Sequence, residues 1–351
     1  MKKLIIFIQL IMLIYITGRD PYRDSDIAAG FSVEAVLLQY SLGQRPSVYN
    51  YNNHIYFVTT QGVFYFYGHE QTWYHMHYTE EPILSGAGTY IAVWQAGDTA
   101  ASVFGSSGYI FTVNVGRPIL NFTVNCRGYS AMVVEYDDIY YIYVLDPDGR
   151  ELFHTVISDS NIFPLGAALG ENILAISLMD TNNPNITGHV LFFDIYRGAI
   201  GAVNMGYGII STVKFVDDLL FVVLPTKLMV IDEGLNIAWE KYGDIQDAFF
   251  DSSVIALLTY SGISFLDHSG YLLGYYDLQN SVSYFGGALG HVIIGSGRQF
   301  TALDAHGTPI WEFISIPEPL ELHFLDSTQR ILLKTPIEGQ ILETASAAPT
   351  S

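Results

Sequence analysis

Three histidines close together in the sequence come nearest to a metal site. His75 and His77 alternate along a predicted strand, so their imidazoles point to one face of the sheet. A zinc site needs a third or fourth ligand held by supporting residues, and only His69 or Glu70 in the preceding turn could supply it. We therefore interpret this segment as an exposed polar outer strand and assign no metal ligand.

The other groups capable of catalysis lack a specific pattern. The sequence Asp146-Pro147-Asp148-Gly149 resembles the start of a calcium loop, but the further oxygen ligands that such a loop needs do not follow it. Gly295 and Gly297 flank Ser296 directly, which is not the Gly-x-Ser-x-Gly spacing of a serine hydrolase. No catalytic or cofactor-binding residue is assigned. Acids that meet across a central channel would escape this reasoning, because they are distant in sequence. Paired carboxylates occur at Glu80-Glu81, Asp137-Asp138 and Asp217-Asp218.

Charge and cysteine content exclude several classes of partner and site. The chain of 351 residues has a formal net charge of −20, which opposes binding to nucleic acid and to anionic lipid surfaces. Its one cysteine, Cys126, excludes an intrachain disulfide and a cysteine-built zinc site. We expect Cys126 to be a small buried hydrophobe inside a strand.

The first 30 residues predict a membrane-targeting segment followed by a linker. Lys2 and Lys3 precede an apolar run from Leu4 to Ile16 that only Gln9 interrupts. No small-x-small cleavage site follows, so we favour an uncleaved signal anchor at 1–17 over a cleaved signal peptide. By the positive-inside rule the folded body then lies outside the cytoplasm. Residues 18–30 are polar and read as a linker.

A phased repeat in the rest of the chain determines the architecture. Trp239, Tyr275 and Trp311 are 36 residues apart, and each follows an Asp that ends an apolar run. The Asp can hydrogen-bond the backbone of a turn, a nearby Gly can adopt positive φ, and the aromatic residue begins an outer strand. Such a period with four short strands per unit predicts a β-propeller. The repeat residues are Asp146 with Phe153, Asp232 with Trp239, Asp267 with Tyr275, and Asp304 with Trp311.

The units predict an all-β propeller at 31–343, with eight four-stranded blades and seven as the alternative. Three C-terminal strands need a fourth, and a lone strand at 36–42 can supply it and close the ring. The segment 180–188 is longer than most hairpin loops, and residues 344–351 read as a disordered tail. Full units are expected to begin near Pro46, Glu80, Pro118, Ser160, Ile209, Ile245 and Ser281.

The segments 230–239 and 302–311 resemble the repeat of quinoprotein-like propellers, in which the matching Asp and Trp help to lock adjacent blades. The layout of anchor and propeller is also similar to an uncharacterised family of membrane-anchored propellers of Gram-positive bacteria, and to the propeller lipoprotein of the outer-membrane assembly machine without its lipid-bearing cysteine. The quinone-dependent dehydrogenases of this superfamily use a vicinal disulfide and a calcium site. With one cysteine, the chain is expected to hold no cofactor.

These features favour a monomeric, non-enzymatic scaffold in the cell envelope that binds an envelope or membrane protein. The alternative is a glycan-binding or small-ligand-binding protein, or an enzyme, that uses the axial channel of the propeller. Acids clustered at the channel mouth would favour chemistry, whereas a broad exposed tyrosine surface would favour a protein partner.

Overall fold

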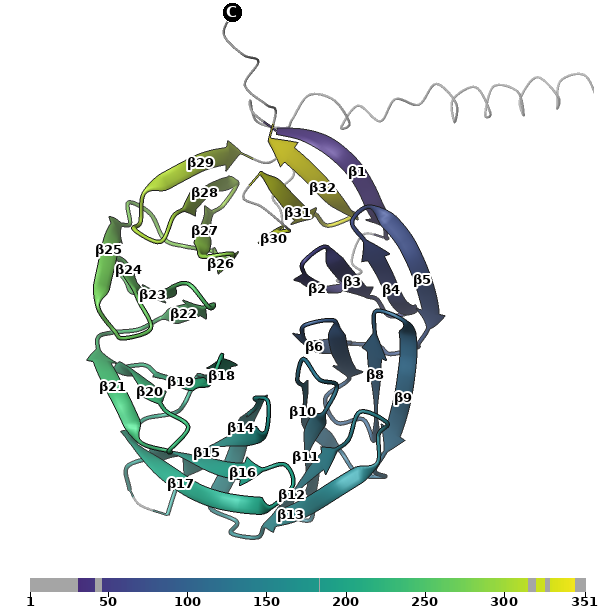
Figure 1. The fold of residues 1–351 in the computed structure, drawn as a ribbon, viewed down its shortest axis with the longest axis vertical. Coiled ribbons are helices and arrows are strands. Elements are labelled where there is room, and N and C mark those ends of the chain that lie inside the picture. The colour runs from purple at the N-terminus through teal and green to yellow at the C-terminus, as the bar shows by residue number, and fades with distance from the viewer. Residues whose placement is uncertain (1–30, 42–45, 183, 315–319, 326–328, 345–351) are drawn as a thin grey trace, which may run out of the picture.

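The computed structural model describes residues 31–41, 46–182, 184–314, 320–325 and 329–344. Thirty-two strands form eight antiparallel sheets of four strands each. Seen down the short axis, the sheets stand as blades around a central opening (Figure 1). The prediction of eight four-stranded blades is confirmed, and the seven-blade alternative is wrong.

The first four blades follow one another along the chain, each from its inner to its outer strand. Blade I consists of β2 (Ser47–Tyr51), β3 (His54–Val58), β4 (Gly62–Tyr67) and β5 (Glu70–Met76). Blade II consists of β6 (Ile83–Ala87), β7 (Tyr90–Trp94), β8 (Ala100–Gly105) and β9 (Gly108–Asn114). Blade III consists of β10 (Ile119–Val124), β11 (Ser130–Tyr136), β12 (Ile139–Leu145) and β13 (Glu151–Ile157). Blade IV consists of β14 (Ile162–Leu169), β15 (Ile173–Asp180), β16 (Thr187–Asp194) and β17 (Gly198–Tyr207).

Blades V to VII repeat the same order. Blade V consists of β18 (Thr212–Val216), β19 (Leu219–Leu224), β20 (Lys227–Ile231) and β21 (Ile237–Tyr242). Blade VI consists of β22 (Asp247–Phe250), β23 (Ile255–Leu258), β24 (Gly262–Leu266) and β25 (Leu272–Asp277). Blade VII consists of β26 (Tyr284–Ala288), β27 (His291–Ser296), β28 (Gln299–Leu303) and β29 (Pro309–Ile314).

Blade VIII joins the two ends of the described chain. Its strands β30 (Glu321–Phe324), β31 (Arg330–Lys334) and β32 (Glu338–Thr344) pair in sequence, and β1 (Phe31–Gln39) adds to β32 as the outer strand. Arg330 fastens this closure through two bonds to the carboxylate of Glu34, at 2.9 and 3.0 Å. The closing strand is the predicted one, but it begins at Phe31 and not at Val36.

The core lies between blades. Eight clusters of buried apolar side chains each contain residues of two neighbouring blades, so one cluster lies at each of the eight interfaces. Because the middle strands meet protein on both faces, their residues read as continuous apolar runs. The segment Leu220–Leu224 of β19 shows this pattern, since all of its side chains are buried.

The antiparallel strands give the ring two distinct faces. We call the face with the blade-to-blade connections and the turns between second and third strands the upper face. The lower face has the other turns, which join first to second and third to fourth strands. Side chains on each face therefore come from known turns of the repeat.

Candidate functional site

The four repeat aspartates lie in third-to-fourth-strand turns on the lower face. In each turn the backbone N–H three residues after the Asp donates to its carbonyl, and the Asp Oδ1 accepts further N–H groups. Three turns place their Gly at positive φ, but in the Asp232 turn Leu235 takes that conformation, with φ of 61°, and Gly234 does not. The Oδ1 donors are the N–H groups of Asp148 and Arg150 for Asp146, Asn236 for Asp232, Ser269 and Tyr271 for Asp267, and His306 and Thr308 for Asp304.

The repeat aromatics lie on outer strands and differ in their contacts. Trp239 donates from Nε1 to the carbonyl oxygen of His268 in blade VI, at 2.8 Å. Phe153 packs on Phe193 of the next blade, with ring centroids 6.2 Å apart. The ring of Tyr275 stays on its own blade, where its hydroxyl donates to Ser261 Oγ at 3.2 Å. The fourth, Trp311, contacts Phe324 and Phe31 of blade VIII edge-on.

Two further aromatic residues on outer strands that also contact the next blade were not identified from the sequence. Trp73 of blade I donates from Nε1 to the carbonyl oxygen of Ser106 in blade II, at 3.0 Å. Phe111 of blade II lies against Gly149 in the turn of blade III, so closely that a Cβ at Gly149 would come within 2.6 Å of its ring. The turns before Trp73 and Phe111 have no Asp at the repeat position. The spacing of Trp73 and Phe111 from the first residue of their outer strands would have been enough to identify them.

The three histidines do not converge on a common point. His75 stacks on Tyr109 of blade II with ring centroids 5.0 Å apart, and His77 meets the edge of Phe104. Burial, followed by the neighbouring His75, lowers the pKa of His77. His69 instead faces Glu34, at 3.8 Å. The strand is the outer strand of blade I and most of its side chains are exposed, as expected, but His75 and His77 themselves are half-buried in the interface between blades I and II.

Cys126 differs from its prediction. It lies in the turn between β10 and β11 on the lower face, and its side chain is exposed. Its Cβ lies close to the turn of blade II, where a Cβ at Gly88 would come within 3.1 Å. The prediction rested on the general tendency of free cysteine to be buried, but the turn Asn125–Tyr129 follows β10 directly.

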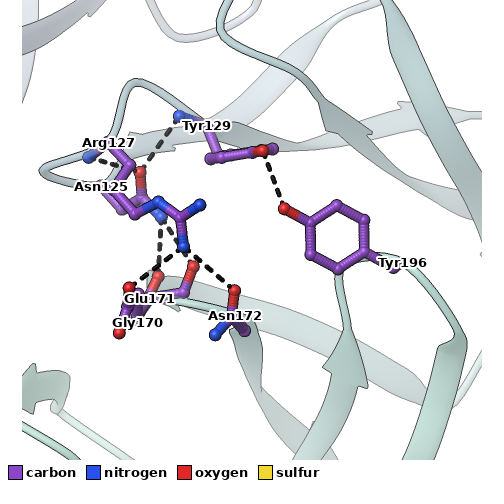
Figure 2. Close-up of polar contacts among 7 residues, drawn as sticks. All are labelled: Asn125, Arg127, Tyr129, Gly170, Glu171, Asn172 and Tyr196. Carbon is purple, nitrogen blue, oxygen red and sulfur yellow. Dashed lines mark hydrogen bonds and ion pairs between the residues drawn. The ribbon is translucent and has the colours of Figure 1, made fainter.

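A polar network ties blades III and IV together on the lower face (Figure 2). Asn125 is only 2% exposed, and its Nδ2 donates to the carbonyl oxygen of Gly170 at 2.8 Å. Arg127 pairs with Glu171 at 3.1 Å, and Tyr196 donates to the hydroxyl of Tyr129 at 2.8 Å. The hydrogen bond with Tyr129 raises the pKa of Tyr196. Because Asn125, the buried member of the network, hydrogen-bonds to backbone atoms, we assign this network to the packing of blades III and IV.

The most exposed apolar side chains of the upper face over blades IV and V are four residues that we call the Tyr207–Tyr242 patch. Ile186 comes from the long loop of blade IV, Tyr207 and Ile209 flank the connection to blade V, and Tyr242 ends β21. The two tyrosines are 71% and 70% exposed. Gly208 N–H donates to the Ile186 carbonyl oxygen at 3.1 Å, which holds the loop beside the connection. The patch thus spans two blades.

An ion pair orders one end of this patch. Lys227 Nζ contacts Glu240 Oε1 at 3.0 Å, and the Tyr242 hydroxyl donates to Glu240 Oε2 at 2.8 Å. The hydrogen bond from Tyr242, then Lys227, lowers the pKa of Glu240, and the same carboxylate raises the pKa of Tyr242. Lys227 also lies 5.7 Å from the Tyr242 ring centroid. The exposed Tyr242 is therefore held in place by contacts within its own blade.

A cavity of about 260 Å³ lies beside the patch, among the inner strands of blades III, IV and V. It extends from Ile210 on the blade connection to Leu165 and Gly166 of β14. Blade IV thus presents both an exposed apolar surface and a recess near the central opening. The remaining lining residues are Asn121, Ala167, Ser177, Ser211, Thr212 and Val213.

Among the described residues, no group of three or more His, Cys, Asp or Glu side chains is placed to hold a metal ion. Within the same ranges, no helix is long and apolar enough to cross a membrane. The segments predicted as anchor at 1–17 and linker at 18–30, and all but the first residue of the predicted tail at 344–351, lie outside the described residues.

Solved structures similar to this chain share its fold at low sequence identity. BamB from Moraxella catarrhalis matches with a TM-score of 0.58 and 12% identity, over 88% of this chain and 100% of that one. The computationally designed Ika8 protein matches with a TM-score of 0.63 and 12% identity, over 91% and 100%. The Pan2 WD40 domain of Neurospora crassa matches with a TM-score of 0.51 and 9% identity, over 93% and 99%. These likenesses support the propeller fold alone.

No curated protein matches the sequence. A family model does match, over residues 31–312, and it is described as a family of unknown function. The match covers the closing strand β1, six complete blades, and blade VII up to residue 312 within β29. Because it spans most of the chain, this protein belongs to that family, DUF5711.

Proposed function

We propose that this protein is a non-enzymatic scaffold of the cell envelope, which binds an envelope or membrane protein through the Tyr207–Tyr242 patch. The observation that carries the proposal is the exposure of two tyrosines and two isoleucines on adjoining blades. Exposed apolar clusters on a folded protein mark interaction sites. Tyrosine suits such a site because its ring offers rigid contact area and one polar tip.

Membrane attachment is the second part of the proposal. Two lysines followed by an apolar run at Leu4–Ile16 have the form of a signal anchor. Its orientation would place a monomeric propeller on the extracytoplasmic side, joined to the anchor by residues 18–30. The resemblance to membrane-anchored propellers of Gram-positive bacteria points in the same direction.

The test is crosslinking and affinity capture of the tagged full-length protein from native membranes. The wild type is compared with a double variant, Tyr207→Ser with Tyr242→Ser. The matched control is Tyr271→Ser, because Tyr271 is 73% exposed but lies on the lower face. We expect one membrane protein to be captured in near-equal amount by the wild type and the control and to be lost from the double variant.

Capture that is equal for all three proteins would reject the patch as the binding surface. Failure of the wild type to retain any partner would reject the scaffold function itself. Thermal unfolding of each variant shows whether a loss of capture reflects a loss of fold, and surface substitutions of this kind usually change stability by less than about 0.5 kcal/mol.

A second candidate, binding of a glycan or small ligand in the axial channel, is favoured by one observation. The cavity beside the patch combines polar and apolar walls next to the central opening. That combination is typical of small-ligand sites.

A further inference from the structure

Two of the eight inner strands are irregular, and both line the cavity. β10 carries a register shift between Ile119 and Asn121, and β14 carries one between Pro164 and Gly166. The other six inner strands pair with their neighbours without a shift. Bulges occur preferentially next to functional sites, where they re-aim side chains. Here they leave the bulged residues Leu120 and Leu165 37% and 39% exposed.

The cavity has polar groups with unused hydrogen-bonding capacity. Asn121 Oδ1 is buried and has no hydrogen-bond partner within the described residues. The hydroxyls of Ser177 and Ser211 donate to the backbone oxygens of Gly166 and Val223, each at 3.2 Å, so their lone pairs remain as acceptors. A buried polar atom without a partner is costly unless something else satisfies it.

The other residues that line the cavity limit which kinds of ligand it can bind. Leu165, Ile210 and Val213 form an aliphatic side, and no charged side chain lines the cavity. The net charge of −20 also repels anions from the central opening. Gly166 leaves open space toward the cavity, since a Cβ there would meet only Ser177 Oγ at 3.4 Å and Val213 at 3.9 Å.

We infer that this cavity is a binding site for a small neutral ligand, a single-ring sugar or related polyol. Its hydroxyl or amide groups donate to the lone pair of Ser211 Oγ, which is the exposed one of the two serines, while its ring carbons lie against Leu165 and Val213. The inference concerns the channel wall and does not depend on the Tyr207–Tyr242 patch.

The test is a titration of the full-length protein, in detergent if it is membrane-bound, with N-acetylglucosamine as the probe. This sugar is neutral and has an amide N–H as well as hydroxyls. Binding is followed by calorimetry or by saturation-transfer NMR. Glucuronate serves as the counter-probe, because it has the same ring size and a carboxylate. We expect saturable binding of the neutral sugar and none of the anionic one.

Gly166→Val fills the cavity and is expected to weaken binding about tenfold or more. Its matched control is Gly243→Val, because Gly243 has no atom within 4 Å of a built Cβ and lies on the exposed connection after β21. If Gly166→Val does not fold, Ser211→Ala removes the exposed acceptor without filling the cavity, and it should also weaken binding.

Four results would overturn the inference. The first three are no saturable binding by the wild type, equal binding of glucuronate, and unchanged binding in the variants that fold. The fourth is a crystal grown with the sugar that shows only water in the cavity. Because Tyr207→Ser and Tyr242→Ser leave the cavity untouched, they should not change sugar affinity, so failure here and failure of the scaffold function are distinguishable.

Discussion

The indole Nε1 of Trp239 donates a hydrogen bond of 2.8 Å to the carbonyl oxygen of His268, and this bond joins blade V to blade VI. The indole also covers Gly270 in the same turn, where a Cβ would approach its ring atoms to 3.0 Å. His268 in turn contacts the backbone oxygen of Asp251 at 2.8 Å. One aromatic residue therefore fixes a turn that is itself held to the turn between β22 and β23 of its blade.

Replacing Trp239 with Phe should remove the bond to His268 and keep an aromatic ring. We expect a loss of about 1–2 kcal/mol in the free energy of unfolding, because one hydrogen bond and part of the contact area disappear. Urea denaturation measures this loss of unfolding free energy. The control is Tyr275→Phe, which loses only an exposed bond to Ser261 and should change stability by less than about 0.5 kcal/mol. Equal losses in both variants would contradict an interblade role for Trp239.

Alanine at Gly270 should cost more than alanine at Gly297. Both glycines have positive φ, 82° and 59°, so each substitution carries a strain of about 1–2 kcal/mol. Only the Gly270 side chain would collide with Trp239, whereas nothing lies within 4 Å at Gly297. We expect an additional loss of roughly 1–3 kcal/mol at Gly270, measured as the difference in urea midpoint. Combining Gly270→Ala with Trp239→Ala should remove that difference.

Acid should weaken the turn built on Asp304. At Asp304, burial raises the pKa, but hydrogen bonds from the N–H groups of Thr308 and His306 outweigh it and lower the pKa overall. When the pKa of a carboxyl group is lower in the folded state than in the unfolded state, the group stabilises the fold at pH values above its unfolded pKa. This stabilisation is lost as the pH falls below about 4. We expect Asp304→Asn to be slightly less stable than the wild type near neutrality, and the two unfolding midpoints to converge in acid. A constant gap between the two midpoints at all pH values would show that the charge of Asp304 contributes nothing.

The exposed Cys126 offers a test of membrane topology. Because it is the one cysteine of the chain and its side chain is exposed, a membrane-impermeant maleimide should label it in cells whose propeller lies outside the cytoplasm. We expect labelling of intact cells, after removal of the cell wall where it obstructs, to equal that of lysed cells. Cys126→Ser gives the background. Labelling that appears only after lysis would place the propeller inside the cell.

The sequence was sufficient to predict the propeller because its signals are local and repeated. Each apolar run marks a middle strand, and each Asp marks a turn, as at Asp267 and Asp304. The pairing of distant ends could also be predicted, since three C-terminal strands lack a fourth and an N-terminal strand lacks a sheet. The predicted strand begins five residues later than β1, because the polar residues Ser32 and Glu34 interrupt the apolar pattern before Val36.

The candidate site could not be predicted in the same way. Asn121, Gly166 and Ser211 lie on three blades, and only the curvature of the ring brings them to one cavity. The bulges depend on how β10 and β14 pair, which period-two alternation does not reveal. The surroundings of His75 were misjudged for a similar reason, because Tyr109 on which it stacks belongs to the next blade. A sequence pattern analysed one repeat at a time gives no information about contacts between repeats.

The pairing of β1 with β32 has a consequence for how the protein is made. Phe31 and Thr344 are register partners, so during synthesis β1, the first of the described strands, must wait for β32, the last of them. Until then seven blades can stack as they appear, but the edge of β32 does not yet exist and β1 has no sheet to join. Such a strand exposes unpaired backbone to other chains. The ring is therefore most open to association with other chains in the interval before β32 emerges, and β1 is the strand that a chaperone would have to shield.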